Sequence, residues 1–294
     1  MALPNVKRNT GIGLVAPAGA VKPEQIREGI QILKENGFPV KQGKHLYESY
    51  RHFAGTIEQR VEDIHTFLHD PEIDVLLAIR GGSGSAQLLP EIDFQLWKRT
   101  GKLLIGFSDI TAMQWGLWAK TELASLSGMA LTLQLHKQNP YTQLFVDILS
   151  GKKSSIQDSD LALEEIVVHR AGSVEDVLLG GTLSIINSLL GTPFFPRLST
   201  FILFIEDINE PIYKIERSLA QLKMAGVLDK VSGLILGRFI DEDKALEIWQ
   251  TLEYLFPRDV PVVANFPYGH YPDSCVLPLG LPVRLESTPF RLSW

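Results

Sequence analysis

The strongest constraint on the fold is an alternation of short apolar runs with amphipathic segments over about the first 120 residues. Ile12–Ala16, Val75–Ile79 and Leu103–Phe107 are continuous apolar runs, typical of strands that are buried on both faces. Between them lie segments such as Ile26–Leu33, whose apolar residues recur at helical spacing. Strands that alternate with helices predict a parallel sheet covered by helices on both sides.

A polar stretch, Lys152–Asp160, separates this region from a second one with more strand signal. We therefore predict two α/β domains with a site between them: an N-terminal domain of residues 1–150, a linker of residues 151–163 and a smaller, strand-rich C-terminal domain of residues 164–294. The expected strands of the second domain include Ile166–His169, Val177–Leu179, Phe201–Ile205 and Leu234–Leu236, with helices over Thr182–Leu190 and Tyr213–Ala225.

Composition excludes several classes of protein. The chain has 294 residues and a net charge of -6 without a basic stripe, so nucleic acid is not an expected partner. No apolar run is long enough to cross a bilayer, and the apolar run after Lys7 and Arg8 is broken by Pro17, which favours a strand over a signal peptide. The single cysteine, Cys275, suits a reducing compartment. We expect a soluble, cytoplasmic protein without a membrane partner.

The sharpest local feature is the Gly106–Asp109 segment, in which a buried strand ends, Ser108 lies at the corner and a helix begins. In a nucleophile elbow this arrangement exposes the serine hydroxyl at the helix N-terminus. The backbone N–H of Asp109 then faces an oxyanion formed on the substrate. The usual elbow has glycine two residues after the serine, where this chain has Ile110. The alternative interpretation is an ordinary helix cap, since serine and aspartate are common at that position.

A glycine-rich loop, Arg80–Ser85, follows the Val75 strand. Its glycines allow the backbone to approach a ligand closely, although the loop matches neither the P-loop nor the dinucleotide-binding fingerprint. A tight turn from strand to helix explains the same residues. The loop and Ser108 both follow parallel strands, so they are expected at one sheet edge, where open α/β sheets bind ligands.

Two further candidates lie in the second region. Glu206 and Asp207 end an apolar run, and strand alternation places their side chains on opposite faces. His270 lies in a loop that contains glycine and proline and follows the strand Val262–Ala264, a plausible setting for a general base. Cys275 is an alternative nucleophile, but no helix N-terminus is apparent to activate it. The histidines show no zinc-ligand spacing, and a single cysteine excludes cysteine-rich metal sites, so we expect no metal.

Taken in order, four motifs resemble the LD-carboxypeptidase family, also called muramoyltetrapeptide carboxypeptidases. The resemblance extends from the Ala16–Gly19 turn to the C-terminal Pro278–Leu281 segment, and the four motifs are Arg80–Ser85, Gly106–Thr111, Ile205–Asn209 and Phe266–His270. It implies a metal-independent triad without a cofactor. In that triad Ser108 is the nucleophile, His270 the base and Glu206 its orienting acid. The oxyanion donors it implies are the backbone N–H groups of Asp109, Gly81 and Gly82.

The resemblance also implies a function. It predicts hydrolysis of the L,D-amide bond that releases D-alanine from murein tetrapeptides during peptidoglycan recycling, by a cytoplasmic homodimer. The alternatives are an immunity-type relative that cleaves toxic peptide-nucleotide conjugates and a non-catalytic protein that binds a small ligand. This chain departs from the family at Ser83, where an aromatic is usual, and Leu131–Gln143 is a variable segment outside the four motifs.

Overall fold

The computed structural model describes residues 3, 10–161, 165–241, 244–245 and 247–294. Its first sheet has the strand order β13-β5-β4-β3-β1-β2, and all neighbours pair in parallel except β13 with β5. The strands are β1 (Gly11–Val15), β2 (Val40–Gln42), β3 (Ile73–Ala78), β4 (Leu103–Gly106), β5 (Ser125–Ser127) and β13 (Leu277–Leu279).

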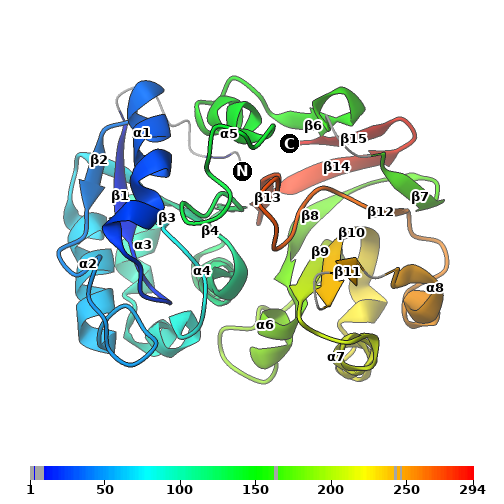
Figure 1. The fold of residues 1–294 in the computed structure, drawn as a ribbon. Helices are drawn as coiled ribbons and strands as arrows, with labels where there is room; N and C mark the ends of the chain where they lie inside the picture. Colours follow the sequence, from blue (N-terminus) through cyan, green and yellow to red (C-terminus); the bar gives the residue numbers. More distant parts are fainter. Residues whose placement is uncertain (1–2, 4–9, 162–164, 242–243, 246) are drawn as a thin grey trace.

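Helices surround this sheet, which forms the left half of Figure 1. They are α1 (Arg27–Glu35), α2 (Ile57–His69), α3 (Phe94–Thr100), α4 (Thr111–Thr121) and α5 (Thr142–Leu149), with 3-10 turns at Pro23–Ile26, Ser85–Glu91 and Ser108–Ile110. α2 packs closely on β1 because Gly13 has no side chain. A Cβ at Gly13 would lie 2.6 Å from the ring of Phe67. The helix begins with a capping box in which the Gln59 N–H donates to Thr56 Oγ1.

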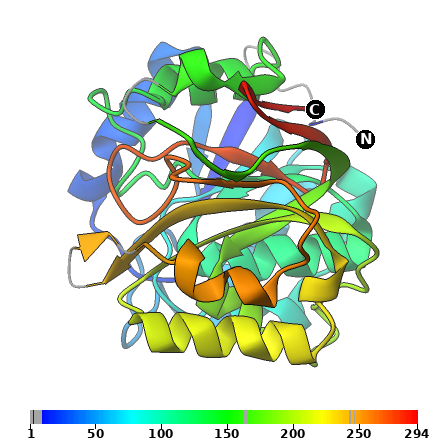
Figure 2. The same ribbon diagram turned by 90° about the vertical axis from the view of Figure 1, so that its right-hand side faces the viewer.

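The second sheet has the order β6-β15-β14-β8-β9-β10-β12-β7, with β11 paired to β10. Strands β8, β9, β10 and β12 are parallel, and the outer strands are antiparallel. In Figure 2, α7 runs below these strands. The elements are β6 (Ser155–Gln157), β7 (Val167–Arg170), β8 (Ser173–Thr182), β9 (Phe201–Ile208), β10 (Val231–Asp241), β11 (Lys244–Ala245), β12 (Val262–Ala264), β14 (Pro282–Ser287), β15 (Phe290–Ser293), α6 (Leu183–Ser188), α7 (Ile212–Met224), α8 (Trp249–Leu252) and 3-10 turns at Asp158–Asp160, Leu228–Lys230 and Glu253–Leu255.

The two sheets are joined by packing as well as by the chain. Trp115 in α4 is buried, and its indole N–H donates to the carbonyl of Gly180 in β8 at 2.8 Å. One apolar cluster runs continuously from α4 to β8 and β9, including Met113, Leu179 and Leu203. Strand β13, which comes late in the chain, completes the edge of the first sheet. These contacts hold loops from both halves in a fixed relation.

The predicted fold class, α/β with a parallel N-terminal sheet and a strand-rich second part, is confirmed. The structure adds that β6 lies inside the predicted linker of residues 151–163 and pairs with β15, so that segment contributes to the second sheet. Residues 162 and 163 of the linker lie outside the described residues. Within the described part of the chain, every helix is too short or too polar to span a membrane.

The strand order of the first sheet creates a switch point between β1 and β3. In open parallel sheets the crevice at such a point, beyond the carboxyl ends of the strands, is where ligands bind. Here the loops after β1 and β3 meet, and the N–H of Gly19 donates to the carbonyl of Gly81 at 3.1 Å. The glycine-rich loop therefore lies at the position that the topology favours for a ligand.

Candidate active site

Ser108 lies at a strained corner between β4 and the turn that begins α4. Its φ of 64° is in the left-handed region, which a residue other than glycine adopts at an expense of about 1–3 kcal/mol. Gly106 explains how the chain accepts isoleucine at position 110, since a Cβ on Gly106 would lie 2.4 Å from Ile110 Cγ2. The backbone thus has the geometry of a nucleophile elbow, and the glycine before the serine makes room for the large side chain after it.

The side chains of Ser108, His270 and Glu206 form a continuous hydrogen-bonded chain. His270 Nε2 lies 2.7 Å from Ser108 Oγ, and His270 Nδ1 lies 2.8 Å from Glu206 Oε2. Because a carboxylate only accepts, Nδ1 carries the ring proton and Nε2 is left to accept from the serine hydroxyl. Residues that are 162 positions apart in the sequence therefore meet as a nucleophile, a base and an orienting acid would.

Glu206 is held by its neighbours on β9 and β8. Its side chain is fully buried, and Thr182 Oγ1 donates to Oε1 at 2.6 Å while Oε2 accepts from His270. Asp207 points elsewhere and accepts from the backbone N–H of Ser184 at 2.7 Å, at the start of α6. Burial, together with the charge of Glu206, raises the pKa of Asp207 to about 6. The two acids therefore have different partners, as strand alternation predicts.

The loop that carries His270 is tied to the Leu131–Gln143 segment. Gln134 Nε2 donates to the carbonyl of Gly269 at 3.1 Å, and Asn139 Nδ2 donates to the carbonyl of Ser274 at 3.0 Å. Sequence analysis missed both amides. They come from loop positions 135 residues before their partners, and no local pattern marks them as supports for a histidine.

The glycine-rich loop packs directly against the elbow. A Cβ on Gly81 would lie 2.6 Å from the Cβ of Ser108, so only glycine allows this approach. Ser85 locks the loop in place, because its N–H donates to Asp109 Oδ2 at 2.8 Å and its hydroxyl donates to the Asp109 carbonyl at 2.6 Å. The structure therefore brings the predicted backbone donors of Gly81, Gly82 and Asp109 to the segments around the serine.

A cavity of about 280 Å³ opens at this point. Its walls come from the loops after β1, β3 and β4, from the turn after β5 and from the histidine loop. The lining residues are Gln25, Arg80, Gly81, Gly82, Phe107, Ser108, Ala130, Thr132, Leu133 and His270. Sequence analysis identified the glycines, the serine and the histidine but assigned no role to the others in this cavity.

Comparison with known proteins finds one family in both halves of the chain. Residues 12–128 match the LD-carboxypeptidase N-terminal domain, and residues 175–285 match the LD-carboxypeptidase C-terminal domain. The chain belongs to the LD-carboxypeptidase family. The predicted family and the predicted class of enzyme, a serine-type carboxypeptidase, are thereby confirmed.

Three relatives indicate the range of this family. The probable murein peptide carboxypeptidase of Bacillus subtilis (strain 168) is 33% identical and covers 94% of this chain and 88% of its own length. The crystal structure of the muramoyltetrapeptide carboxypeptidase from Oxalobacter formigenes is 30% identical, with a TM-score of 0.83 and coverage of 96% and 98%. The structure of MccF in complex with glutamyl sulfamoyl guanosine is 25% identical, with a TM-score of 0.87 and coverage of 100% and 97%.

The protonation of His270 in this LD-carboxypeptidase fold is set by opposing effects. Burial disfavours the charged imidazole, but the charge and hydrogen bond of Glu206, with the charge of Asp207, outweigh it and raise the pKa of His270. Only the neutral imidazole can take a proton from serine.

We therefore predict that kcat/KM falls on the acid side with an apparent pKa above about 6.5, the ordinary value for histidine. Replacing Glu206 by glutamine should move this acid limb to lower pH, because the partner that stabilises the imidazolium is lost. A pH profile of kcat/KM for the wild type and Glu206→Gln measures both values. An acid limb of the wild type with an apparent pKa below the ordinary histidine value would contradict this electrostatic account.

Cys275 is poorly suited to act as the nucleophile of this family member. Its side chain is fully buried, and this burial raises the pKa of the thiol to about 12. The thiolate, which is the reactive form, is therefore disfavoured. Among the residues that the structure describes, no group of three or more histidine, cysteine, aspartate or glutamate side chains is arranged to hold a metal ion.

Proposed function

We propose that this protein hydrolyses the L,D-amide bond that joins the C-terminal D-alanine to a murein tetrapeptide. The observation that carries the proposal is the hydrogen-bonded chain from Ser108 through His270 to Glu206, at the wall of a cavity of about 280 Å³. The names of the Bacillus and Oxalobacter relatives support this substrate class.

In the first half of the reaction, Ser108 Oγ attacks the carbonyl carbon of the scissile amide while His270 Nε2 takes the hydroxyl proton. Glu206 stabilises the imidazolium that forms. The negative charge on the carbonyl oxygen is received by backbone N–H groups of Asp109 and of the Gly81–Gly82 turn. When the C–N bond breaks, His270 returns its proton to the leaving nitrogen, so D-alanine departs as an amine and the acyl group stays on Ser108.

The second half repeats these steps with water. His270 removes a proton from a water molecule, whose oxygen attacks the ester carbon of the acylated Ser108. The same backbone donors receive the oxyanion, and His270 then returns the proton to Ser108 Oγ. This half releases a tripeptide with a new carboxylate and regenerates the free enzyme. Over both halves, one water molecule is consumed and one D-alanine is released.

Mass spectrometry of purified muropeptides tests this proposal. Wild type should remove one D-alanine from the tetrapeptide, Ser108→Ala should remove none, and the matched peptide that ends in L-alanine should stay intact with both proteins. If the wild type also leaves the D-alanine tetrapeptide intact, the murein substrate is wrong. If Ser108→Ala leaves ligand affinity and every biological activity unchanged, the alternative of a non-catalytic binding protein is favoured instead.

The second candidate function is an immunity-type hydrolase that cleaves peptide-nucleotide conjugates. It is favoured by the likeness to MccF, which extends over the whole chain. Incubation of the wild type with glutamyl sulfamoyl guanosine, beside the tetrapeptide, separates the two candidates by their products. Cleavage of the nucleoside compound alone would favour the immunity-type function.

The proposed setting is the cytoplasm, where a peptidoglycan-recycling enzyme would meet its peptide, and the proposed assembly is a homodimer that acts without nucleic acid or membrane partners. The single cysteine suits the reducing compartment. Light scattering on the purified protein measures the assembly, and a mass of one chain at working concentration would remove the homodimer from the proposal.

A further inference from the structure

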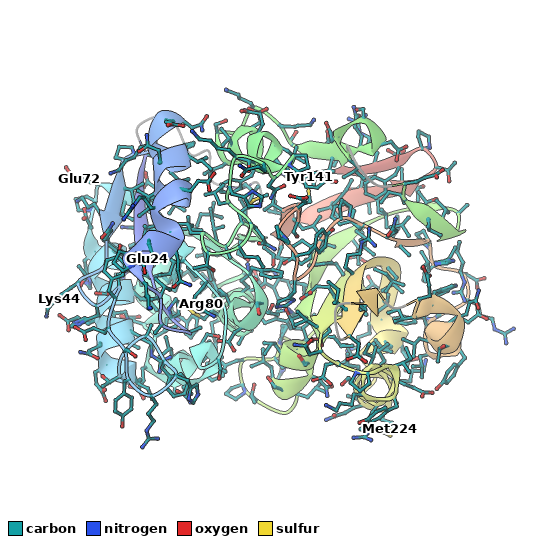
Figure 3. All side chains as sticks on the ribbon, viewed as in Figure 1. Glu24, Lys44, Glu72, Arg80, Tyr141 and Met224 are labelled. Atoms are coloured by element: carbon teal, nitrogen blue, oxygen red, sulfur yellow. The ribbon has the colours of Figure 1, made fainter. Side chains whose placement is uncertain are left out.

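Among the described residues that line the cavity beside Ser108, Arg80 carries a permanent charge, and the triad does not use it. Arg80 follows β3 directly and precedes Gly81, whose backbone packs on Ser108. Figure 3 labels it near the middle of the molecule, on the side of the first sheet that faces the second. Its place at the switch point of the sheet makes it a candidate for binding part of the substrate.

Arg80 is fixed by the turn after β1. Its Nη1 donates to the carbonyl of Ala20 at 2.9 Å. Gly19 leaves room for the guanidinium beside it, because a Cβ on Gly19 would lie only 3.1 Å from Arg80 Nε and 3.3 Å from Cζ. This hydrogen bond uses one of the five N–H groups of the guanidinium. The side chain is therefore held in place at the wall of the cavity.

Within the described part of the chain, Arg80 forms no ion pair with a carboxylate. Arginine is always charged, and its planar fork matches a carboxylate or phosphate with two parallel hydrogen bonds. The nearby triad already carries the buried carboxylate of Glu206, so a second negative charge in the cavity would be repelled unless a cation met it. Arg80 supplies that cation.

We propose that Arg80 binds the C-terminal carboxylate of the substrate and so restricts cleavage to the last residue of the peptide. This inference rests on the proposed function. In a peptide cut at its last bond, the carboxylate carbon is three bonds from the scissile carbonyl carbon, at most about 4 Å away. Arg80 and Ser108 line the same cavity, and Gly81, the next residue after Arg80, packs so closely on the serine that a Cβ on it would lie 2.9 Å from Ser108 Oγ.

This role makes Arg80 a specificity-determining residue, separate from the triad. An enzyme that removes one terminal residue must distinguish a chain end from a continuing chain, and the chemical difference is the charged carboxylate. A site built to pair with that charge loses much of its affinity for an amide, because the half-buried guanidinium is then left without its partner. The alternative ligand for Arg80 is a side-chain carboxylate of the substrate on the acyl side of the scissile bond.

The test compares two murein tetrapeptides, one ending in D-alanine and the other in D-alaninamide. The wild type should prefer the acid by about 100-fold in kcat/KM, the effect of a lost charged hydrogen bond. Arg80→Gln should lower kcat/KM for the acid by about 100-fold, mainly through KM, and leave the amide nearly unchanged. Arg80→Lys should recover part of the preference, and the exposed-site control Arg99→Gln should behave as the wild type.

Each other outcome has a defined consequence. Equal cleavage of acid and amide by the wild type, or an equal loss on both peptides in Arg80→Gln, would overturn the role of Arg80 and leave the proposed function standing. The second pattern is the one expected if Arg80 contacts an acyl-side carboxylate or only supports the loop. Failure of the wild type to cleave either peptide would remove the proposed function and this inference together. Should Arg80→Gln fail to fold, the wild-type ratio and Arg80→Lys still decide the question.

Discussion

Ser108→Ala is expected to lower kcat for D-alanine release by about 10⁴-fold or more, the usual loss when a serine nucleophile is removed. The methyl group cannot form the acyl intermediate, and His270 loses the hydroxyl that lies 2.7 Å from its Nε2. The residual rate would come from binding and from the backbone oxyanion donors. Substrate affinity should change little, because the hydroxyl contributes to bond making more than to binding.

The matched control for this prediction is Ser83→Ala. Ser83 is an exposed serine in the adjacent glycine-rich loop, where the family usually has an aromatic residue. Its replacement should leave kcat within a few-fold of the wild type, and both variants should keep the thermal unfolding temperature of the parent. A Ser108→Ala enzyme that retains a tenth of the wild-type kcat would show that the hydroxyl is not the nucleophile.

Glu206→Gln is expected to lower kcat by about 10³- to 10⁴-fold, although the glutamine side chain has nearly the same shape as glutamate. Glu206 accepts two hydrogen bonds, one from Thr182 and one from His270. Glutamine has one side-chain oxygen in place of two. One donor therefore keeps its acceptor, and the amide nitrogen faces the other, which is either the threonine or the ring. If it faces the ring, His270 Nδ1 must accept, and the proton moves to Nε2, where it blocks the base.

Asp207→Asn is the control, since it removes a neighbouring buried charge without touching the ring. Asp207 accepts from Ser184 and from the N–H of Ile208, and an asparagine oxygen can retain part of these contacts. We expect its kcat to fall less than tenfold, with any larger effect appearing in the unfolding temperature. Equal losses in kcat for the two variants would indicate a general electrostatic effect and contradict the orienting role of Glu206.

Much of the first sheet could be predicted from the sequence because its strands are continuous apolar runs. The prediction for Val75–Ile79 corresponds to β3 at Ile73–Ala78, and the corner at Ser108 follows from a buried strand that ends where a helix begins. The departure at Ile110 is also intelligible once the structure is known. The absent glycine after the serine is compensated by the one before it, Gly106.

Other features depend on contacts between distant parts of the chain and left no local signal. Strand β13 is three residues long, and nothing in its composition indicates that it pairs with β5 in the first sheet. Gln134 supports the histidine loop through one hydrogen bond to a backbone carbonyl, which any sequence at position 269 would offer. The sequence around Arg80 is that of a turn, and only the fold places this residue at the wall of the cavity.

The most direct measurement of the central claim is the residual kcat of the double variant Ser108→Ala/Glu206→Gln beside the two single variants. Groups that act as one unit lose their function together, so the double variant should release D-alanine at the rate of Ser108→Ala alone, within about threefold. A double variant whose loss is the product of the two single losses would show that serine and glutamate act independently, and would contradict a triad built through His270.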